Sequence, residues 1–114
     1  MKFERFEDII AWQKSKELTI KIYSLFSSTK DFGFRDQIQR ASVSIMNNIA
    51  EGFERKGNKE FAKFLFIAKG SCAEVRSMIY LAFELHYISK SNCDNLLNNA
   101  IEISRILSGL IKTL

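Results

Sequence analysis

The chain has 114 residues, of which 46% are hydrophobic and 26% are charged, and its formal net charge is +4. This length predicts a single domain over residues 1–114, and the composition excludes both a disordered chain and a membrane-spanning one. Charged residues among the first ten positions argue against a signal peptide, so we expect a cytoplasmic protein. The positive charge modestly favours a polyanionic partner such as nucleic acid.

The regular structure of the chain is predicted to be entirely helical. Proline is absent, no strand or hairpin pattern occurs, and helix-breaking residues gather at Ser27–Gly33, Lys56–Asn58 and Ser89–Asn92. Short connections of this kind force neighbouring helices to run antiparallel. The sequence therefore predicts an all-α, up-down-up-down four-helix bundle with helices at about residues 7–28, 34–55, 58–86 and 91–114.

The first two helices carry apolar residues in alternating steps of three and four, as a buried helix face requires. In the first helix this seam is Ala11, Ser15, Leu18, Ile22 and Leu25. The second helix is expected to begin after Gly33 and to end before Gly57, a residue suited to a left-handed turn. It has two separate apolar lines, Phe34, Ile38, Ala41, Ile45, Ile49 and Gly52 on one side and Val43, Met46, Ala50 and Phe53 on another.

The third helix, with Asn58 as its expected N-cap, is the most apolar of the four. Its main seam is Phe61, Leu65, Ala68, Cys72, Val75, Ile79 and Ala82, and two further partial lines lie beside it. We expect it either to be the central helix or to pack against another subunit. The fourth helix is expected to begin at Ser91 as N-cap, with Asp94 three residues later. Its seam is Cys93, Leu96, Ala100, Ile103, Leu107, Leu110 and Leu114.

The second and third helices carry more apolar surface than one small bundle can bury. A monomer would therefore expose an apolar patch, which predicts a homo-oligomer.

Residues with catalytic or metal-binding chemistry are sparse. His86 is the single histidine, and its position near a helix end favours a simple interaction of the imidazolium with the helix dipole. Glu51 and Glu54 are paired acids, but no nucleophile or metal motif accompanies them, so a solvated or ion-paired role is favoured. Cys72 and Cys93 are expected to be buried free thiols. We predict no enzymatic activity, no metal and no cofactor.

Two groups of polar residues are candidates for function. Basic residues cluster around the second connection, and the nucleic-acid-binding candidates are Arg40, Arg55, Lys56, Lys59 and Lys63. Neighbouring glutamates leave open the alternative of a solvated face, although repetition in an oligomer would let weak phosphate contacts add up. Adjacent asparagines are unfavourable inside a helix, so Asn47 and Asn48 are expected to make hydrogen bonds across helices or subunits.

The segment FGFRDQIQRASVSIMNNIAEGFERKGNKEFAKFLFIAKGS, which begins at Phe32 and ends at Ser71, resembles the four-helix-bundle proteins encoded in intervening sequences of 23S ribosomal RNA genes. The segment AWQKSKELTIKIY at Ala11–Tyr23 resembles the same family, so the likeness covers nearly the whole chain. Its centre is NIAEG at Asn48–Gly52. The chain departs from the family pattern in a first connection without proline and in Met46, where proline often stands.

This resemblance implies a left-handed antiparallel bundle, with relatives that form rings of five. A related branch is similar to the accessory protein of diversity-generating retroelements, a basic pentameric barrel that binds a reverse transcriptase and nucleic acid. The resemblance carries over no catalytic residues, and the matching polar positions are Asn47, Asn48, Glu51 and Gly52. We expect a non-enzymatic homo-oligomer, a pentamer by resemblance, that binds structured RNA, DNA or a nucleoprotein. The alternative is a structural or protein-interaction module that binds no nucleic acid.

Overall fold

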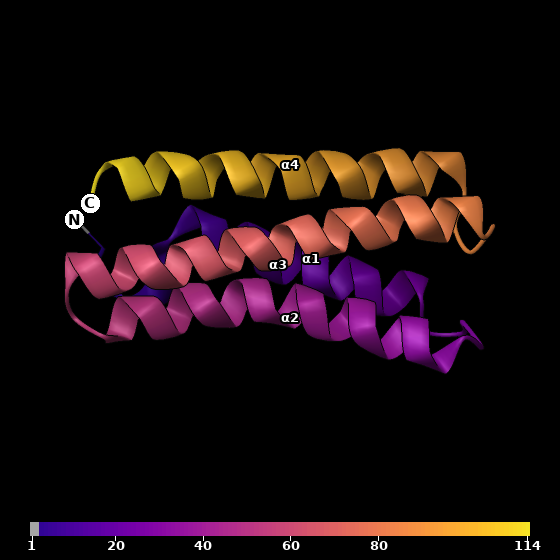
Figure 1. Cartoon of the computed structure of the whole chain (residues 1–114), viewed down its shortest axis with the longest axis horizontal. Helices are drawn as coiled ribbons and strands as arrows, with labels where there is room; N and C mark the ends of the chain where they lie inside the picture. The colour runs from indigo at the N-terminus through magenta and orange to yellow at the C-terminus, as the bar shows by residue number, and fades with distance from the viewer. Residues whose placement is uncertain (1–2) are drawn as a thin grey trace.

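The computed structural model describes residues 3–114 and contains four long helices (Figure 1). A single turn of 3₁₀ helix at Phe6–Asp8 precedes the first of them. The described residues contain no strand, which confirms the all-α prediction. The four helices are α1 (Ile10–Leu25), α2 (Phe32–Glu54), α3 (Asn58–Glu84) and α4 (Lys90–Lys112).

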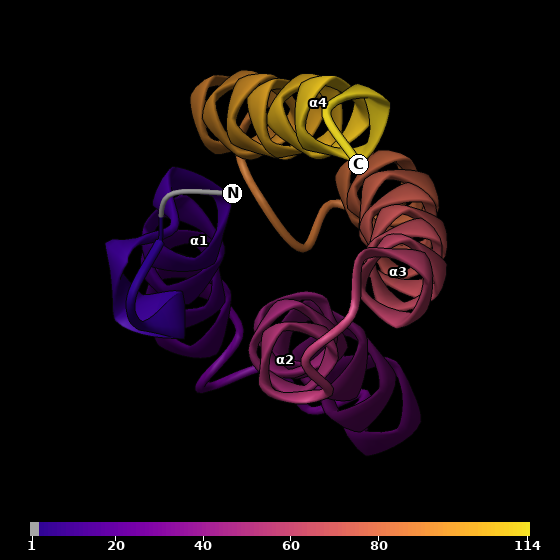
Figure 2. The same ribbon diagram turned by 90° about the vertical axis from the view of Figure 1, so that its left-hand side faces the viewer.

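The helices alternate in direction and surround a common core (Figures 1 and 2). Each helix contacts the two that lie beside it, so α1 packs on α2 and α4, and α3 packs on α2 and α4. The end-on view shows that α3 is one of four equivalent positions around this core. The expectation that α3 is a central helix is therefore wrong, and its extra apolar surface lies on the outside of the bundle.

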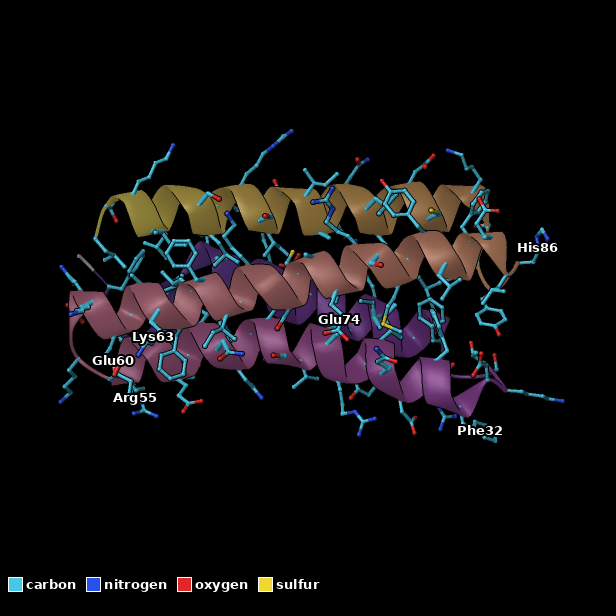
Figure 3. All side chains as sticks on the ribbon, in the orientation of Figure 1. Phe32, Arg55, Glu60, Lys63, Glu74 and His86 are labelled. Carbon is cyan, nitrogen blue, oxygen red and sulfur yellow. The ribbon has the colours of Figure 1, made fainter. Side chains whose placement is uncertain are left out.

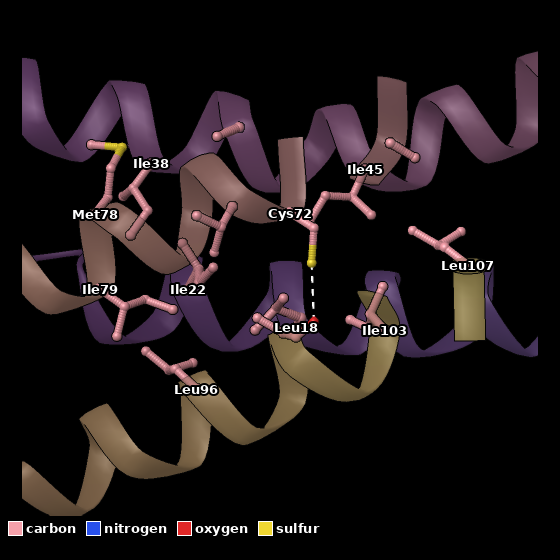
Figure 4. Close-up of a cluster of buried hydrophobic side chains, with 14 of the residues drawn as sticks. Leu18, Ile22, Ile38, Ile45, Cys72, Met78, Ile79, Leu96, Ile103 and Leu107 are labelled. Carbon is pink, nitrogen blue, oxygen red and sulfur yellow. Dashed lines mark hydrogen bonds between the residues drawn. The ribbon is translucent and has the colours of Figure 1, made fainter. Parts of the chain in front are cut away.

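The core is formed by the predicted seams (Figure 4). Aliphatic side chains from all four helices are fully buried there, and each contributes about 1.5–3 kcal/mol of hydrophobic stabilisation. Cys72 lies among them, and its thiol donates a hydrogen bond to the carbonyl of Ala100, 3.0 Å away. Burial raises the pKa of the Cys72 thiol to about 11. Cys93 is also buried and free, so the prediction of two buried free thiols is confirmed.

The contact between α1 and α4 joins the two helices that are farthest apart in the sequence. Lys21 Nζ donates hydrogen bonds to the side-chain oxygens of Asn95, at 3.2 Å, and of Asn99, at 2.8 Å. Lys14 pairs with Glu102 at 3.3 Å. These groups lie on the surface, so the solvent-facing side of the contact between α1 and α4 is polar.

The first helix is shorter than predicted at both ends. Ile9 interrupts it with an extended backbone conformation (φ −78°, ψ 121°) and buries its side chain in the core, with 1% exposed. The side-chain amide of Gln13 donates to the carbonyl of Glu7 at 2.8 Å and fixes the preceding turn. Core packing of Ile9 therefore determines where α1 begins.

The predicted starts of α2 and α4 are each wrong by one or two residues. Asp31 caps α2 by accepting a hydrogen bond from Phe34 N at 3.2 Å, so Gly33 lies inside the helix and is not a break. Ser89, and not Ser91, caps α4 by accepting from Asn92 N at 3.1 Å. Both caps satisfy a backbone N–H of the first turn, the role that was predicted for Ser91 in α4.

The connection between α2 and α3 differs from the prediction. Lys56 adopts the left-handed conformation with φ 56°, whereas Gly57 is extended with φ −178°. Asn58 is the first residue of α3, and no side chain caps this helix. The left-handed turn was expected at Gly57, and its occurrence at a lysine places the Lys56 side chain on a tight bend.

The end of α3 also uses a left-handed residue without glycine. His86 has φ 63°, and its N–H donates to the carbonyl of Phe83 at 3.0 Å. The N–H of Tyr87 donates to the carbonyl of Ala82 at 2.8 Å. This pair of hydrogen bonds is the Schellman motif that closes many helices. His86 therefore lies just beyond α3, in a turn.

Within residues 3–114, no helix is both long and apolar enough to cross a membrane.

Candidate nucleic-acid interface

Four of the five predicted nucleic-acid-binding cations gather at one end of the bundle, where α2 ends and α3 begins. These are Arg55, Lys56, Lys59 and Lys63, and Figure 3 shows Arg55 and Lys63 at this end together with Glu60. Arg40 is fifteen residues before Arg55 on α2, which is about 22 Å along the helix. The structure therefore separates Arg40 from the other candidates.

Arg55 is held by contacts on two sides. Its guanidinium donates to Glu51 Oε1 at 3.0 Å, one helical turn earlier. The same group lies over the ring of Phe64, 5.1 Å from the ring centre. An exposed ion pair contributes less than about 1 kcal/mol, and an exposed cation–π contact contributes about 0.5–1 kcal/mol. Arg55 is thus positioned, but a carboxylate already neutralises part of its charge.

The three lysines of this end are exposed, and none of their side chains makes a hydrogen bond or an ion pair with any residue in the range 3–114. Carboxylates nevertheless surround them. Four cations face the three glutamates Glu51, Glu54 and Glu60, so the local excess is one positive charge. A shallow pocket of about 320 Å³ at the turn is lined by groups of both signs, including Glu4, Glu54 and Lys56. The electrostatic attraction of this end for a polyanion is therefore weak in one copy.

The polar positions of the NIAEG segment serve the contact between α2 and α3. Asn48 Nδ2 donates to the carbonyl of Ser44 at 2.8 Å and to its hydroxyl at 3.0 Å. The Ser44 hydroxyl shares a hydrogen bond of 2.8 Å with the hydroxyl of Ser71 on α3. Asn48 therefore makes no cross-helix bond of its own, but it holds the Ser44 side chain that bonds Ser71 of α3. Asn47 is exposed, and among the described residues its side chain has no hydrogen-bond partner.

Gly52 marks a close approach of α2 to α3. A Cβ atom at this position would collide with the Cβ atom of Phe64 and would lie 3.2 Å from Cδ1 of Phe61. Two aromatic rings thus occupy the space that a side chain would need. The sequence motif is explained by helix packing here, while Glu51 on the same turn points outward and pairs with Arg55.

Sequence reasoning missed Ser44, Ser71 and Phe64 as partners of this motif. Ser44 and Asn48 are four residues apart and therefore adjacent on one helix face, which is the signal that could have linked them. The partners on α3 require the register of two antiparallel helices, which a single sequence does not reveal.

The other residues with potential chemistry remain apart. Figure 3 shows His86 at the end of the bundle opposite to Arg55 and Lys63. The His86 side chain is exposed and has no hydrogen-bond partner within residues 3–114. In the same range, no three histidine, cysteine, aspartate or glutamate side chains come together as metal ligands would. The cations of the α2–α3 end are the candidate site that remains from the sequence.

Comparison with known proteins gives a consistent result. The family model described as 23S rRNA-intervening sequence protein matches residues 7–109. A crystal structure of a protein of unknown function from the S23 ribosomal protein family of Bacteroides thetaiotaomicron has the same fold, with a TM-score of 0.84 and 27% sequence identity. That alignment covers 90% of this chain and 99% of the other. No functionally curated protein matches the chain.

Proposed function

The chain belongs to the 23S rRNA-intervening sequence protein family, and from this premise we propose that it is a non-enzymatic, homo-oligomeric helical scaffold in the cytoplasm. Its proposed partner is structured RNA, or a nucleoprotein that contains it, bound through basic surfaces repeated around the assembly. Five copies is the number that the family resemblance predicts. The relation to the retroelement accessory protein stays a prediction.

The observation that carries this proposal is an apolar line on the outer surface of α3. Ile67, Leu81 and Leu85 lie along it and are each more than two-fifths exposed. Glu74, between Ile67 and Leu81 on the same line, accepts a hydrogen bond from Gln37 of α2, so the line borders α2. Exposed side chains of this size on one helix are typical of a surface that packs against a second copy.

The net charge of +4 supports a polyanionic partner for the assembly. A closed oligomer repeats each cation once per copy, and linked weak contacts gain affinity through effective concentration. A patch that attracts RNA weakly in one copy can therefore bind it usefully in a ring.

Oligomerisation is tested by size-exclusion chromatography with light scattering. The wild type is expected at several times the 13.2 kDa of one chain, with five times that mass for a pentamer. The double variant Ile67→Gln with Leu81→Gln removes the apolar line without changing charge, and it should be a monomer. Ile20→Gln on α1 is the matched control, because Ile20 is 61% exposed and lies on a helix that does not contact α3. A monomeric wild type at micromolar concentration would contradict the proposal.

RNA binding is tested by fluorescence anisotropy with a labelled RNA hairpin that carries single-stranded tails. Binding should be measurable at about 50 mM salt and should weaken steeply towards 200 mM, because phosphate contacts release counterions. If RNA binding were undetectable at low salt, or if its affinity did not change with salt, the nucleic-acid part of the proposal would be wrong.

The second candidate function is a structural or protein-interaction module that binds no nucleic acid. The mixed charge at the α2–α3 end favours it, because Glu51, Glu54 and Glu60 offset most of the cations there. An oligomer that forms as expected but does not bind RNA would select this alternative.

A further inference from the structure

A basic groove runs along the surface between α3 and α4, away from the candidate cations at the α2–α3 end. Its larger part has a volume of about 410 Å³ and is lined by Arg76, Arg105 and Lys112, among others. An adjoining part of about 210 Å³ is lined by Phe66, Lys69 and again Lys112. We call these two parts together the α3–α4 groove.

The four cations of the groove have a regular spacing. Lys69 and Arg76 are seven residues apart on α3, and Arg105 and Lys112 are seven residues apart on α4. Seven residues make about two helical turns, so each pair lies on one helix face about 10 Å apart. Two rows of positive charge, one on α3 and one on α4, thus face the α3–α4 groove. The larger part alone extends from Ile101 to Lys112, about 16 Å along α4.

Within the described part of the chain, no carboxylate pairs with these four charges. Among the described residues, no aspartate or glutamate lines either part of the groove. None of its four cations makes an ion pair or a side-chain hydrogen bond with any residue between 3 and 114. In contrast, Arg55 at the α2–α3 end is paired with Glu51. The α3–α4 groove is therefore the more strongly positive surface.

Arg76 has a hydrogen-bond donor without a partner. Its Nε atom is shielded from water, and it is the one such side-chain nitrogen or oxygen atom in residues 3–114 without a hydrogen bond. A buried donor that is left unpaired costs about 1–3 kcal/mol. Because Nε is shielded even from water, a phosphate does not reach this atom. An anion in the groove would instead interact with the positive charge of the guanidinium, which no carboxylate of the groove lining neutralises.

Small polar groups of α4 complete the lining. Ser104 and Ser108 are one helical turn apart, and both line the larger part of the groove. Gly109 lies beside them, and a Cβ atom there would meet nothing within 4 Å. Hydroxyl groups beside an open backbone can donate to phosphate oxygens, as in many phosphate contacts of nucleic-acid-binding proteins.

We propose that the α3–α4 groove binds the phosphodiester backbone of a single RNA strand. The larger part of the groove, about 16 Å long, exceeds one phosphate group and fits several consecutive phosphates, which follow one another every ~3.4 Å or more along a strand. Phe66 and Tyr80 lie on the α4 side of α3 and are 58% and 53% exposed. Exposed rings beside a row of cations are the arrangement in which bases stack while the backbone follows the charges.

This assignment rests on the proposed function for the identity of the polyanion, but it moves the site to residues that are distinct from Lys56, Lys59 and Lys63. It also leaves the proposed oligomer surface free. Ile67 and Leu81 follow the neighbouring line of α3, about 100° around the helix from Phe66 and Tyr80. RNA binding and self-association can thus be disrupted separately.

The decisive experiment compares two double variants in binding a labelled single-stranded RNA of mixed sequence. Arg105→Gln with Lys112→Gln removes two exposed cations of the groove, and Lys59→Gln with Lys63→Gln removes two exposed cations of the α2–α3 end. The groove variant should bind at least 10-fold more weakly, and its log–log salt slope should fall by about 1.4 for two lost phosphate contacts. The control should change less than about 3-fold. Circular dichroism and light scattering establish that both variants keep the fold and assembly of the wild type.

Two further variants test the chemistry of the groove. Arg76→Lys keeps the charge but removes the forked guanidinium, so it should weaken RNA binding several-fold while the salt slope stays as in the wild type. Phe66→Leu should weaken RNA binding but leave the binding of inorganic polyphosphate unchanged, because polyphosphate has no bases to stack.

The outcomes separate this inference from the proposed function. Salt-dependent RNA binding by the wild type with equal losses in the two double variants, or a larger loss in the control, would overturn the groove and leave the proposed function standing. Absence of RNA binding by the wild type would overturn both. Equal affinity for polyglutamate, or for a blunt RNA duplex, would overturn the assignment of a single RNA strand.

Discussion

Gly52 of α2 lies directly against Phe64 of α3, and a Cβ atom at position 52 would be 3.1 Å from the Cγ atom of that ring and closer still to its Cβ atom. Two helices approach each other here more closely than any residue with a side chain would permit. The NIAEG segment therefore contributes to the spacing of α2 and α3 whatever else it does.

Gly52→Ala should destabilise the fold. The added methyl group must displace Phe64 or separate the helices, and overpacking of this kind costs about 1–3 kcal/mol. Urea unfolding followed by circular dichroism measures the change. Gly70→Ala on α3 is the matched control, because a Cβ atom there meets nothing within 4 Å. The control should gain about 0.5–1 kcal/mol from helix propensity, so a loss of similar size in both variants would contradict the packing argument.

Ser44→Ala should also destabilise the α2–α3 contact. It removes the acceptor hydroxyl of Asn48 and leaves the half-buried hydroxyl of Ser71 without its partner. A fully buried unpaired hydroxyl costs about 1–3 kcal/mol, and a half-buried one costs less. The double variant Ser44→Ala with Ser71→Ala should lose less than the sum of the single variants, because no hydroxyl is then left alone. Strictly additive losses in a double-mutant cycle would show that the two serines do not interact.

His86→Gly should stabilise the protein by about 1 kcal/mol. His86 has φ 63°, a conformation that costs an ordinary residue about 1–2 kcal/mol and costs glycine almost nothing. Thermal unfolding measures the gain. Glu84→Gly, inside the last turn of α3, is the control. It should destabilise the protein, because no left-handed conformation is relieved at position 84 and glycine has a lower helix propensity than glutamate. If His86→Gly were destabilising, the imidazole would have a contact that the structure does not show.

The stability contributed by Tyr87 should depend on pH at both ends of the scale. Its hydroxyl donates to Asp31 at 2.7 Å, which lowers the pKa of Asp31 from 3.8 and raises the pKa of Tyr87 from 10.0. The lowered carboxyl pKa means that stabilisation is present above pH 3.8 and is lost as pH falls through the folded-state value. The raised phenol pKa means that it is present below pH 10.0 and is lost as pH rises through the folded-state value.

The melting temperature of Tyr87→Phe should therefore lie furthest below that of the wild type between about pH 4 and pH 10. The difference should shrink as pH falls through the folded-state pKa of Asp31, which lies below 3.8, and as pH rises through that of Tyr87, which lies above 10.0. A constant difference across this range would mean that the hydrogen bond does not form in solution, and that any effect of the substitution comes from the environment of the ring.

The sequence predicted the parts of the fold that depend on periodicity. Leu18, Ile45, Ile79 and Leu107 were each placed in a seam by their spacing, and all are fully buried. A helix with a three-and-four pattern of apolar residues has one stable way to bury them, so this information is local.

The helix ends were less predictable, because several residues compete for each turn. Gly57 is the expected left-handed residue, but the structure uses Lys56, and Ser89 caps α4 although Ser91 would also suit the role. The choice depends on where the core positions the two helices, which is not encoded by the turn residues alone. Similarly, the groove cations Arg76 and Arg105 belong to different helices, and only the register of α3 and α4 brings them together.

The ring of helices closes where α1 packs on α4, which among the four α-helices described is the one pairing of helices that do not follow each other in the sequence. Every other pairing of two α-helices joins consecutive helices through a short connection, so these hairpins form early and with little loss of chain entropy. The hydrogen bonds of Lys21 with Asn95 and Asn99 are exposed, so they add little to the stability of the contact between α1 and α4. Folding should therefore end with the docking of α1 onto α4, and slow opening of the native protein should begin there.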